Sequence, residues 1–183
     1  MTIKYTVKWK KTNFSDIIDV RSPAEFKEDN ISGSINLPVL NNKQRVDIGK
    51  IYKKESPFKA KKIGASLVSN NISKHLKKVL INKPGNWKPL IYCWRGGQRS
   101  KAFATVLSEI GWQVTVLKGG YKTYRSSINN EINKLTKTSR FIVLKGPTGC
   151  AKTKILELLK KKGLSVLNLE ELASHKGSLL GEI

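Results

Sequence analysis

The stretch Leu90–Ser100 constrains the fold of this chain more than any other part of the sequence. A short apolar run ends at Cys93, a polar loop with two adjacent glycines follows, and a segment with helical periodicity comes next. This order predicts a buried strand that carries Cys93 at its carboxyl end and a loop that turns toward a helix N-terminus. Open α/β sheets bind their ligands at that edge, so we expect a functional site there.

The loop after Cys93 has the composition of an anion-binding site. Successive backbone N–H groups can converge on one point, and the following helix adds the positive end of its dipole. Gly96 and Gly97 permit the backbone dihedrals that such a loop needs, including positive φ. A thiolate at Cys93 would be stabilised there relative to the thiol, which makes Cys93 the candidate catalytic nucleophile. A sulfur or selenium atom carried on Cys93 would be held as an anion by the same groups.

Two arginines flank the glycines and add positive charge to the loop. Arg95 and Arg99 can each bind an oxyanion through a forked pair of N–H groups. The spacing between Cys93 and Arg99 leaves room for a tetrahedral oxyanion. A buried structural cysteine is the simpler alternative, but it does not explain the glycines and arginines. The predicted substrate- or oxyanion-binding loop comprises Trp94, Arg95, Gly96, Gly97, Gln98, Arg99 and Ser100.

Composition limits the class of protein. At 183 residues and a formal net charge of +22, the chain can bury one good core and should attract a polyanion such as RNA or DNA. A lysine-rich composition spread over a solvated surface is the simpler alternative. Two cysteines, Cys93 and Cys150, form no disulfide framework and suit a reducing cytosol. The sequence shows no signal-peptide pattern and no apolar run of membrane length, so we expect a cytoplasmic protein without membrane contact.

A second candidate site segment lies near the start of the chain. Asp16–Val20 is a short apolar run that predicts a buried strand, and Ser22–Glu25 has the cap, proline and glutamate of a helix N-terminus. In a parallel sheet, Asp19 and Arg21 would lie at the same edge as Cys93. We interpret them as a pair that shapes the loop and caps the helix, and we favour this role over direct catalysis.

Strands that alternate with helices predict an α/β fold with a mostly parallel sheet and helices on both faces. Residues 1–14 form an arm or an edge strand in this scheme, and residues 136–139 form a linker. The other expected elements are a strand at 33–38, a weak helix at 42–54, a helix at 56–81 with a break near 70–71, a helix at 99–110 stopped by Gly111, a strand at 113–117 and a helix at 121–135.

A second glycine-rich loop follows the linker. Phe141–Leu144 predicts a buried strand, and a turn with Lys-Thr opens a helix that extends through Lys161, which is the context of a P-loop. Lys152 would contact terminal phosphates, and Thr153 would face a magnesium ion. The predicted phosphate-binding residues are Gly146, Thr148, Gly149, Lys152 and Thr153. Ala151 replaces the usual last glycine and would cost about 1–2 kcal/mol if this position needs positive φ.

The C-terminal part is too short for a complete P-loop domain. Ser165–Leu169 predicts a second strand, which would make residues 136–183 an incomplete β-α-β fragment. A two-stranded piece of this kind is marginally stable alone. We therefore expect either a truncated chain or a separate chain that completes the domain.

Several motifs resemble one family, the tRNA 2-selenouridine synthases, in which a rhodanese domain precedes a P-loop domain. Residues 93–100 (Cys-Trp-Arg-Gly-Gly-Gln-Arg-Ser) are similar to the active loop of its rhodanese domain, and residues 19–26 to the first rhodanese signature. Further resemblance lies at residues 45–49, 56–65, 118–121 and 173–178. Asn168 and Glu171 depart from the family pattern, which has an acidic and a small residue there.

The resemblance implies a rhodanese-like domain at residues 1–135 and a partial P-loop domain at 136–183. It implies that the sulfur of 2-thiouridine at the wobble position of a tRNA is replaced by selenium. Selenophosphate would be the donor, and geranyl diphosphate would supply a geranylated intermediate. In that scheme Cys93 is the nucleophile and chalcogen carrier, and its loop holds selenophosphate or the departing phosphate.

The same resemblance assigns the remaining partners. Lys152 and Thr153 would contact the diphosphate, with Mg²⁺ at the P-loop, and dispersed lysines would contact the tRNA backbone. We expect no tightly bound cofactor and no metal site in the rhodanese-like part.

The residues themselves leave three other functions open. A stand-alone sulfurtransferase that passes persulfide sulfur to an acceptor thiol needs only residues 1–135. A cysteine phosphatase also fits the Cys-x5-Arg spacing, although no aspartate is clearly placed as its general acid. A tRNA-binding protein without catalysis fits the incomplete second half and the altered P-loop, and its binding would depend strongly on salt.

Overall fold

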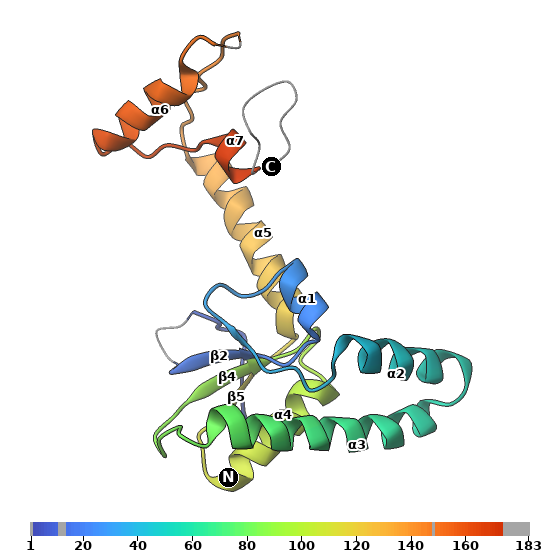
Figure 1. The fold of residues 1–183 in the computed structure, drawn as a ribbon. Helices are drawn as coiled ribbons and strands as arrows, with labels where there is room; N and C mark the ends of the chain where they lie inside the picture. Colours follow the sequence, from blue (N-terminus) through green and yellow to red (C-terminus); the bar gives the residue numbers. More distant parts are fainter. Residues whose placement is uncertain (1, 11–13, 148, 174–183) are drawn as a thin grey trace. The chain divides into compact units, whose positions relative to one another are not determined.

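The computed structural model describes residues 2–10, 14–147 and 149–173, and the chain divides into two compact units, Met1–Leu135 and Thr136–Ile183. Unit 1 is built on a five-stranded sheet with the strand order β1-β5-β4-β2-β3 (Figure 1). Every neighbouring pair is parallel, which confirms the predicted sheet type. The strands are β1 (Lys4–Thr6), β2 (Asp16–Asp19), β3 (Ile35–Asn36), β4 (Pro89–Tyr92) and β5 (Thr115–Leu117).

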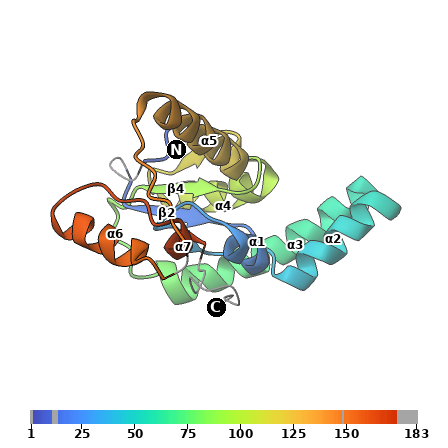
Figure 2. The same cartoon turned by 90° about the horizontal axis from the view of Figure 1, so that it is seen from above.

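Helices cover both faces of this sheet, as the alternating pattern predicted. The helices of unit 1 are α1 (Pro23–Glu28), α2 (Asn42–Lys54), α3 (Pro57–His75), the π-helix η2 (Leu76–Leu80) and α4 (Gln98–Ile110). α5 (Gly120–Thr138) begins in unit 1 and continues past its last residue, Leu135. Side chains of α3, η2 and α4 join the buried cluster on one face of the sheet, and the start of α5 joins the cluster on the other. α2 and α3 lie side by side as a helical hairpin (Figures 1 and 2).

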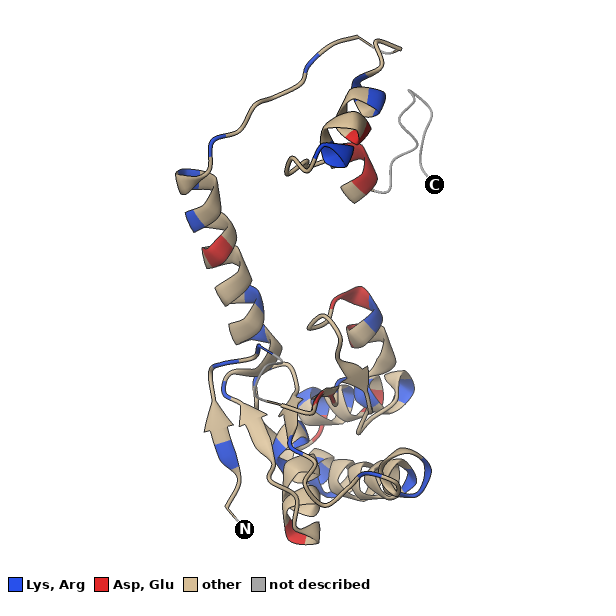
Figure 3. Ribbon diagram, turned by 90° about the vertical axis from the view of Figure 1, so that its left-hand side faces the viewer, with Lys and Arg blue, Asp and Glu red and all other residues tan. Residues whose placement is uncertain are grey.

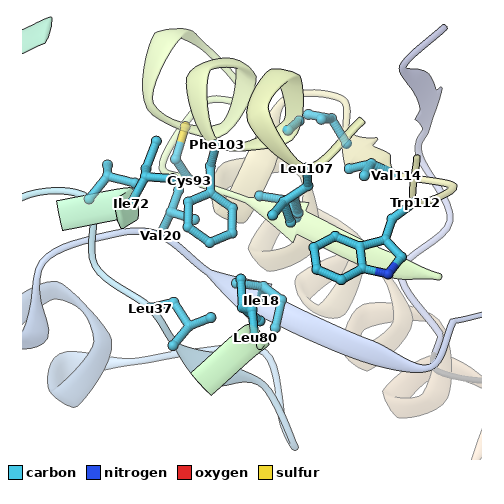
Figure 4. Packing of buried hydrophobic residues seen from close by; sticks show 14 of the residues in the cluster. Ile18, Val20, Leu37, Ile72, Leu80, Cys93, Phe103, Leu107, Trp112 and Val114 are labelled. Carbon is cyan, nitrogen blue, oxygen red and sulfur yellow. The ribbon is translucent and has the colours of Figure 1, made fainter. Parts of the chain in front are cut away.

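Two hydrophobic clusters, one on each face of the sheet, form the core of unit 1. In β4, Ile91 belongs to the larger cluster and Leu90 to the smaller one, because successive residues of a strand point to opposite faces. Figure 4 shows the larger cluster, with Phe103 and Leu107 of α4 pointing toward the strands. All four residues of β4 are buried, as expected for a central strand covered on both faces.

The strand register brings the two predicted site segments to the same edge. Asp19 at the end of β2 is paired with Tyr92 at the end of β4. Val20 and Cys93, which follow these two residues, therefore leave the sheet side by side, and Arg21 comes directly after Val20. β5 is the other neighbour of β4 and ends at Leu117. The candidate site is thus built on the carboxyl ends of three neighbouring strands.

Local sequence signals account for several helix ends. Ser22 and Glu25 interact at the predicted N-terminus of α1, where Glu25 Oε2 accepts from the Ser22 N–H (3.0 Å) and from the Ser22 hydroxyl (2.9 Å). Asn41 and Gln44 form a capping box at α2. Gly111 ends α4 with φ 113°, a left-handed conformation that favours glycine.

Two boundaries differ from the predictions. The helix expected to break near Asn70–Asn71 is continuous there and changes to a π-helix only at η2. Asn71 stays in the helix because its amide donates outward to the backbone oxygen of Val39 (3.0 Å) and to Gln44 Oε1 (2.9 Å). α5 extends through Thr138, so the prediction that the linker begins at residue 136 was wrong.

Unit 2 contains the predicted helix, α6 (Lys152–Lys161), and a short helix, α7 (Leu169–Leu172). The strands predicted at 141–144 and 165–169 are wrong, because none of the described residues of this unit lies in a strand. Ile142 is 96% exposed, so no sheet covers its apolar side chain. A strand forms only where a neighbour accepts its hydrogen bonds and covers its face, and two short segments rarely supply both.

No helix within residues 2–10, 14–147 and 149–173 is both long and apolar enough to cross a membrane.

Candidate active site

Cys93 lies immediately after β4, with its side chain beneath the loop that follows. Its relative exposure is 3%, and its sulfur points toward α4 (Figure 4). The Sγ atom lies 3.3 Å from Ser100 Oγ, and Ser100 Oγ lies 3.0 Å from the Gly97 backbone oxygen, to which it can donate. A thiol at Cys93 can therefore donate to Ser100, whereas a thiolate can accept from Ser100 if the hydroxyl turns away from Gly97. Ser100 can thus serve both protonation states.

The loop carries a run of free backbone donors. Within the described structure, no group accepts a hydrogen bond from the N–H groups of residues 94–100. The first bonded amide is that of Lys101, which donates to the Gly97 oxygen (3.0 Å). The last of these free donors belong to the first turn of α4, where the helix dipole is positive. Such a concentration of donors in one loop is what an anion-binding cradle requires.

The first turn of α5 orients the start of this loop. Tyr121 donates its backbone N–H to the Cys93 oxygen (2.9 Å), and Lys122 donates to the Trp94 oxygen (3.1 Å). No described peptide bond is cis, so each carbonyl points opposite to the N–H group of the next residue. The N–H groups of Trp94 and Arg95 therefore point away from α5. This anchoring leaves both donors free for a ligand.

Two glycine positions allow the loop to lie directly against the turn before α5. Gly96 has φ 65°, and a Cβ atom there would lie 2.6 Å from the Leu117 oxygen. Gly120 has φ 60°, and a Cβ atom there would clash with the Cys93 oxygen. Any side chain at either position would push the loop away from the turn. The glycines are thus required by backbone packing as well as by conformation.

The two predicted arginines have different surroundings. Arg99 forms a two-pronged ion pair with Glu25, with distances of 2.7 and 3.2 Å, and its side chain is 17% exposed. Its guanidinium is therefore engaged by a carboxylate and does not extend freely toward the loop. Arg95 is exposed and makes no hydrogen bond or ion pair with the described residues. Arg95 is consequently the better placed of the two to bind an incoming anion.

Glu25 joins the N-termini of α1 and α4. Burial raises its pKa, but hydrogen bonds and charge from Arg99, together with hydrogen bonds from Ser22, outweigh burial and lower the pKa to about 2. The carboxylate therefore stays ionised over the whole physiological range. It fixes the start of α4, and with it the loop, against the N-terminus of α1.

Asp19 and Arg21 form a fully buried ion pair beside the Cys93 loop. Their side chains are 0% and 1% exposed, and Arg21 Nη2 lies 2.7 Å from Asp19 Oδ2. Arg21 also donates to the backbone oxygen of Asp29 (2.6 Å) and lies over the ring of Tyr121. This geometry suits the loop-shaping role, because neither charged group reaches the surface.

The second loop has the strained backbone that its sequence suggested. Ala151 has φ 59° and is the one non-glycine residue with positive φ among those described. Position 151 thus needs positive φ, and the alanine there costs about 1–2 kcal/mol of backbone strain. Lys152 Nζ is bound to the backbone oxygens of Gly146 (2.9 Å) and Pro147 (2.8 Å). Lys152 Nζ, the atom predicted to bind phosphate, is thus bound to the backbone of its own loop.

The other predicted P-loop residues are placed as follows. Thr153 lies in the first turn of α6 with an exposed side chain, and Gly149 has φ 83°. Thr148 lies outside the described residues.

Comparison with known proteins identifies the architecture. The rhodanese-like domain family matches residues 2–127, which is more than half of the chain. The chain belongs to the rhodanese-like domain family. The matched residues include Cys93 and the loop that follows it. A second family, described as the tRNA 2-selenouridine synthase AAA domain, matches residues 139–183.

Relatives similar to both parts of this rhodanese-like protein are tRNA 2-selenouridine synthases. The protein from Bdellovibrio bacteriovorus is 36% identical over 173 residues, which cover 90% of this chain and 43% of the relative. The protein from Sulfurovum sp. (strain NBC37-1) is 37% identical over 170 residues, covering 92% of this chain and 46% of the relative. The chain thus spans less than half the length of these curated relatives.

A solved structure resembles part of this chain. It is the N-terminal domain of a Clostridium difficile 630 protein described as a candidate ATP/GTP binding protein. The two chains are 34% identical with a TM-score of 0.54, and the match covers 61% of this chain and 87% of that chain.

The sequence predicts only part of the role of two residues at the site. It indicates helix capping for Glu25 and the start of a helix for Tyr121. Both act through partners far away in the sequence, Arg99 for Glu25 and Arg21 and Trp94 for Tyr121. The capping box pointed to a fixed carboxylate, but no local pattern indicated its second partner.

Proposed function

We propose that this chain takes part in replacing the sulfur of 2-thiouridine in tRNA by selenium, with Cys93 as the nucleophile. The Cys93 thiolate would attack C2 of the geranylated base and expel geranyl thiolate, and the selenium of selenophosphate would then displace Cys93 from C2. Hydrolysis of the Se–P bond would release phosphate and leave 2-selenouridine. The observation that carries the proposal is the cysteine beneath a loop whose N–H groups, from residue 94 to residue 100, have no acceptor among the described residues. The relatives that match both units bear the name of this reaction.

The loop suits the phosphate group of selenophosphate. Free amides and the N-terminus of α4 provide donors and a positive potential for a multiply charged oxyanion. Arg95 adds an exposed positive charge at the surface. The phosphate would therefore bind above Cys93, with its selenium near the sulfur atom.

The second loop suits the diphosphate of geranyl diphosphate. A bound diphosphate would replace the backbone oxygens of Gly146 and Pro147 as partners of Lys152. Thr153 would contact a magnesium ion that neutralises the same diphosphate. In the geranylation step the sulfur of 2-thiouridine would form a bond to the geranyl C1, and the bond from C1 to the diphosphate would break, so that diphosphate leaves on this loop.

The charge distribution suits a tRNA partner. Lys and Arg predominate over Asp and Glu in α2, α3, α5 and α6 (Figure 3), and the formal net charge is +22. Neutralising several phosphates releases counterions, so binding should weaken steeply as salt rises.

The test supplies the substrates and reads the nucleosides. Purified protein is incubated with selenophosphate and tRNA already carrying geranylated 2-thiouridine, so that the selenium step is measured without the P-loop. Mass spectrometry should detect 2-selenouridine with the unaltered protein and with Cys150→Ser, but not with Cys93→Ala. Formation of 2-selenouridine by the Cys93→Ala protein would refute the assignment.

A stand-alone sulfurtransferase is the second candidate. Unit 1 alone contains the complete cysteine loop and both hydrophobic clusters. Transfer of sulfur from thiosulfate to cyanide in the absence of tRNA, together with no product on tRNA, would favour this function.

A further inference from the structure

Trp94 ends a stack of three flat groups that begins in the interior. The guanidinium carbon of Arg21 lies 4.1 Å from the centre of the Tyr121 ring, and the Trp94 indole stacks on the same ring at 5.4 Å and 29°. Arg21 and Tyr121 are each 1% exposed, whereas Trp94 is 41% exposed. The stack therefore leads from a buried ion pair to an aromatic surface that is open to solvent.

Each lower layer of the stack is fixed at more than one point. Arg21 is held by Asp19 and by the backbone oxygen of Asp29. The Tyr121 hydroxyl donates to the Asp29 carboxylate, and Arg125 lies 3.3 Å from that carboxylate. Because Arg21 and Tyr121 are fixed in this way, the Trp94 indole that packs on Tyr121 loses little conformational entropy when another ring stacks on it.

The position of the indole matters because of its neighbours. Trp94 directly follows Cys93, and its own N–H group is one of the free donors of the loop. A ligand that stacks on the indole would thus lie next to donors that can meet acceptor atoms at its edge. Pyrimidine bases combine a flat face with carbonyl oxygens at the edge, and single-stranded RNA presents such bases for stacking on aromatic side chains.

We propose that Trp94 is a stacking platform for an unpaired pyrimidine base of RNA, which it holds beside Cys93. The identity of the base as 2-thiouridine rests on the proposed function, whereas the stacking itself does not. The geometry selects a flat ring over an isoprenoid chain, because a ring uses both the indole face and the polar donors.

The experiment measures binding without chemistry. Two fluorescein-labelled RNA hairpins are compared by anisotropy, one with 2-thiouridine in its loop and one with an abasic residue at the same place. Proteins compared are the unaltered chain, Trp94→Phe, Trp94→Leu, Trp94→Ala and the control Phe58→Ala, which removes an aromatic side chain that is 69% exposed on α3. Thermal unfolding of every variant confirms that it is folded.

Stacking predicts that Trp94→Ala and Trp94→Leu weaken binding of the 2-thiouridine hairpin about 10-fold, while Trp94→Phe and Phe58→Ala stay within about 3-fold. The abasic hairpin should bind all variants alike. Equal binding of the 2-thiouridine hairpin by all variants would overturn the proposal. An equal loss for both hairpins, or retention by Trp94→Leu, would also overturn it. If this binding pattern appears but no 2-selenouridine forms, the proposed function fails and the platform stands.

Discussion

Ser100 Oγ lies 3.3 Å from Cys93 Sγ, so the hydroxyl can accept a hydrogen bond from the thiol or donate one to the thiolate. A hydrogen bond of this kind contributes about 1 kcal/mol. Ser100→Ala should therefore lower the free energy of unfolding by about 1 kcal/mol, measured by urea denaturation. Cys150→Ser, at the exposed cysteine, is the control and should leave that free energy unchanged. Equal free energies of unfolding for Ser100→Ala and the unaltered chain would contradict this explanation.

Asp19 and Arg21 show how much the loop depends on a buried pair. Removing one partner leaves a buried charge without compensation, which typically costs 3–5 kcal/mol. Asp19→Ala should lower the free energy of unfolding by about that amount, measured by urea denaturation. Glu55→Ala removes the exposed ion pair with Lys59, in which the two side chains are 48% and 57% exposed, and should cost less than about 1 kcal/mol. Similar losses in the two variants would contradict this account.

Among the secondary-structure elements, α1 and α4 are joined at their N-termini by Glu25 and Arg99. The folded-state pKa of Glu25 is lowered from 4.5 to about 2. Its ionised form therefore stabilises the fold fully above about pH 4.5, and this contribution is lost as pH falls from 4.5 through 2. It amounts to about 2 kcal/mol after allowance for solvent screening.

The prediction compares the unaltered chain with Glu25→Gln at several pH values. The gap between their urea midpoints should be widest above pH 5 and should close as pH falls toward 2. Arg45→Gln serves as the control, because the Arg45 to Glu25 distance is 3.9 Å and the Arg45 side chain is 45% exposed. A difference between the two urea midpoints that does not vary with pH would contradict this prediction and would indicate that Glu25 contributes through packing alone.

The elements that could be predicted from the sequence are those specified by residues close together in the chain. β4, the caps of α1 and the stop at Gly111 all rest on residues within a few positions of one another. The pair of Glu25 and Arg99 spans 74 positions, and no local pattern contains it. The predicted strand at 141–144 failed for the same reason, because apolar residues form a strand only when a neighbouring strand is present.

At the scale of the whole molecule, the site and the hydrophobic core both belong to unit 1. The buried clusters draw on residues between Ile17 and Tyr121. A fragment of residues 1–138, which keeps α5 intact, should therefore unfold cooperatively within about 4 °C of the full chain. Differential scanning calorimetry measures both. A fragment without a cooperative transition would show that unit 1 depends on unit 2.

The central claim is that the loop of residues 94–100 binds an oxyanion above Cys93. Titration of the ¹⁵N-labelled chain with inorganic phosphate, with chloride at equal ionic strength as control, tests this most directly. We expect phosphate to cause saturable shifts in the amide resonances of residues 94–100 that chloride does not produce. Phosphate that leaves those resonances where chloride leaves them would contradict it.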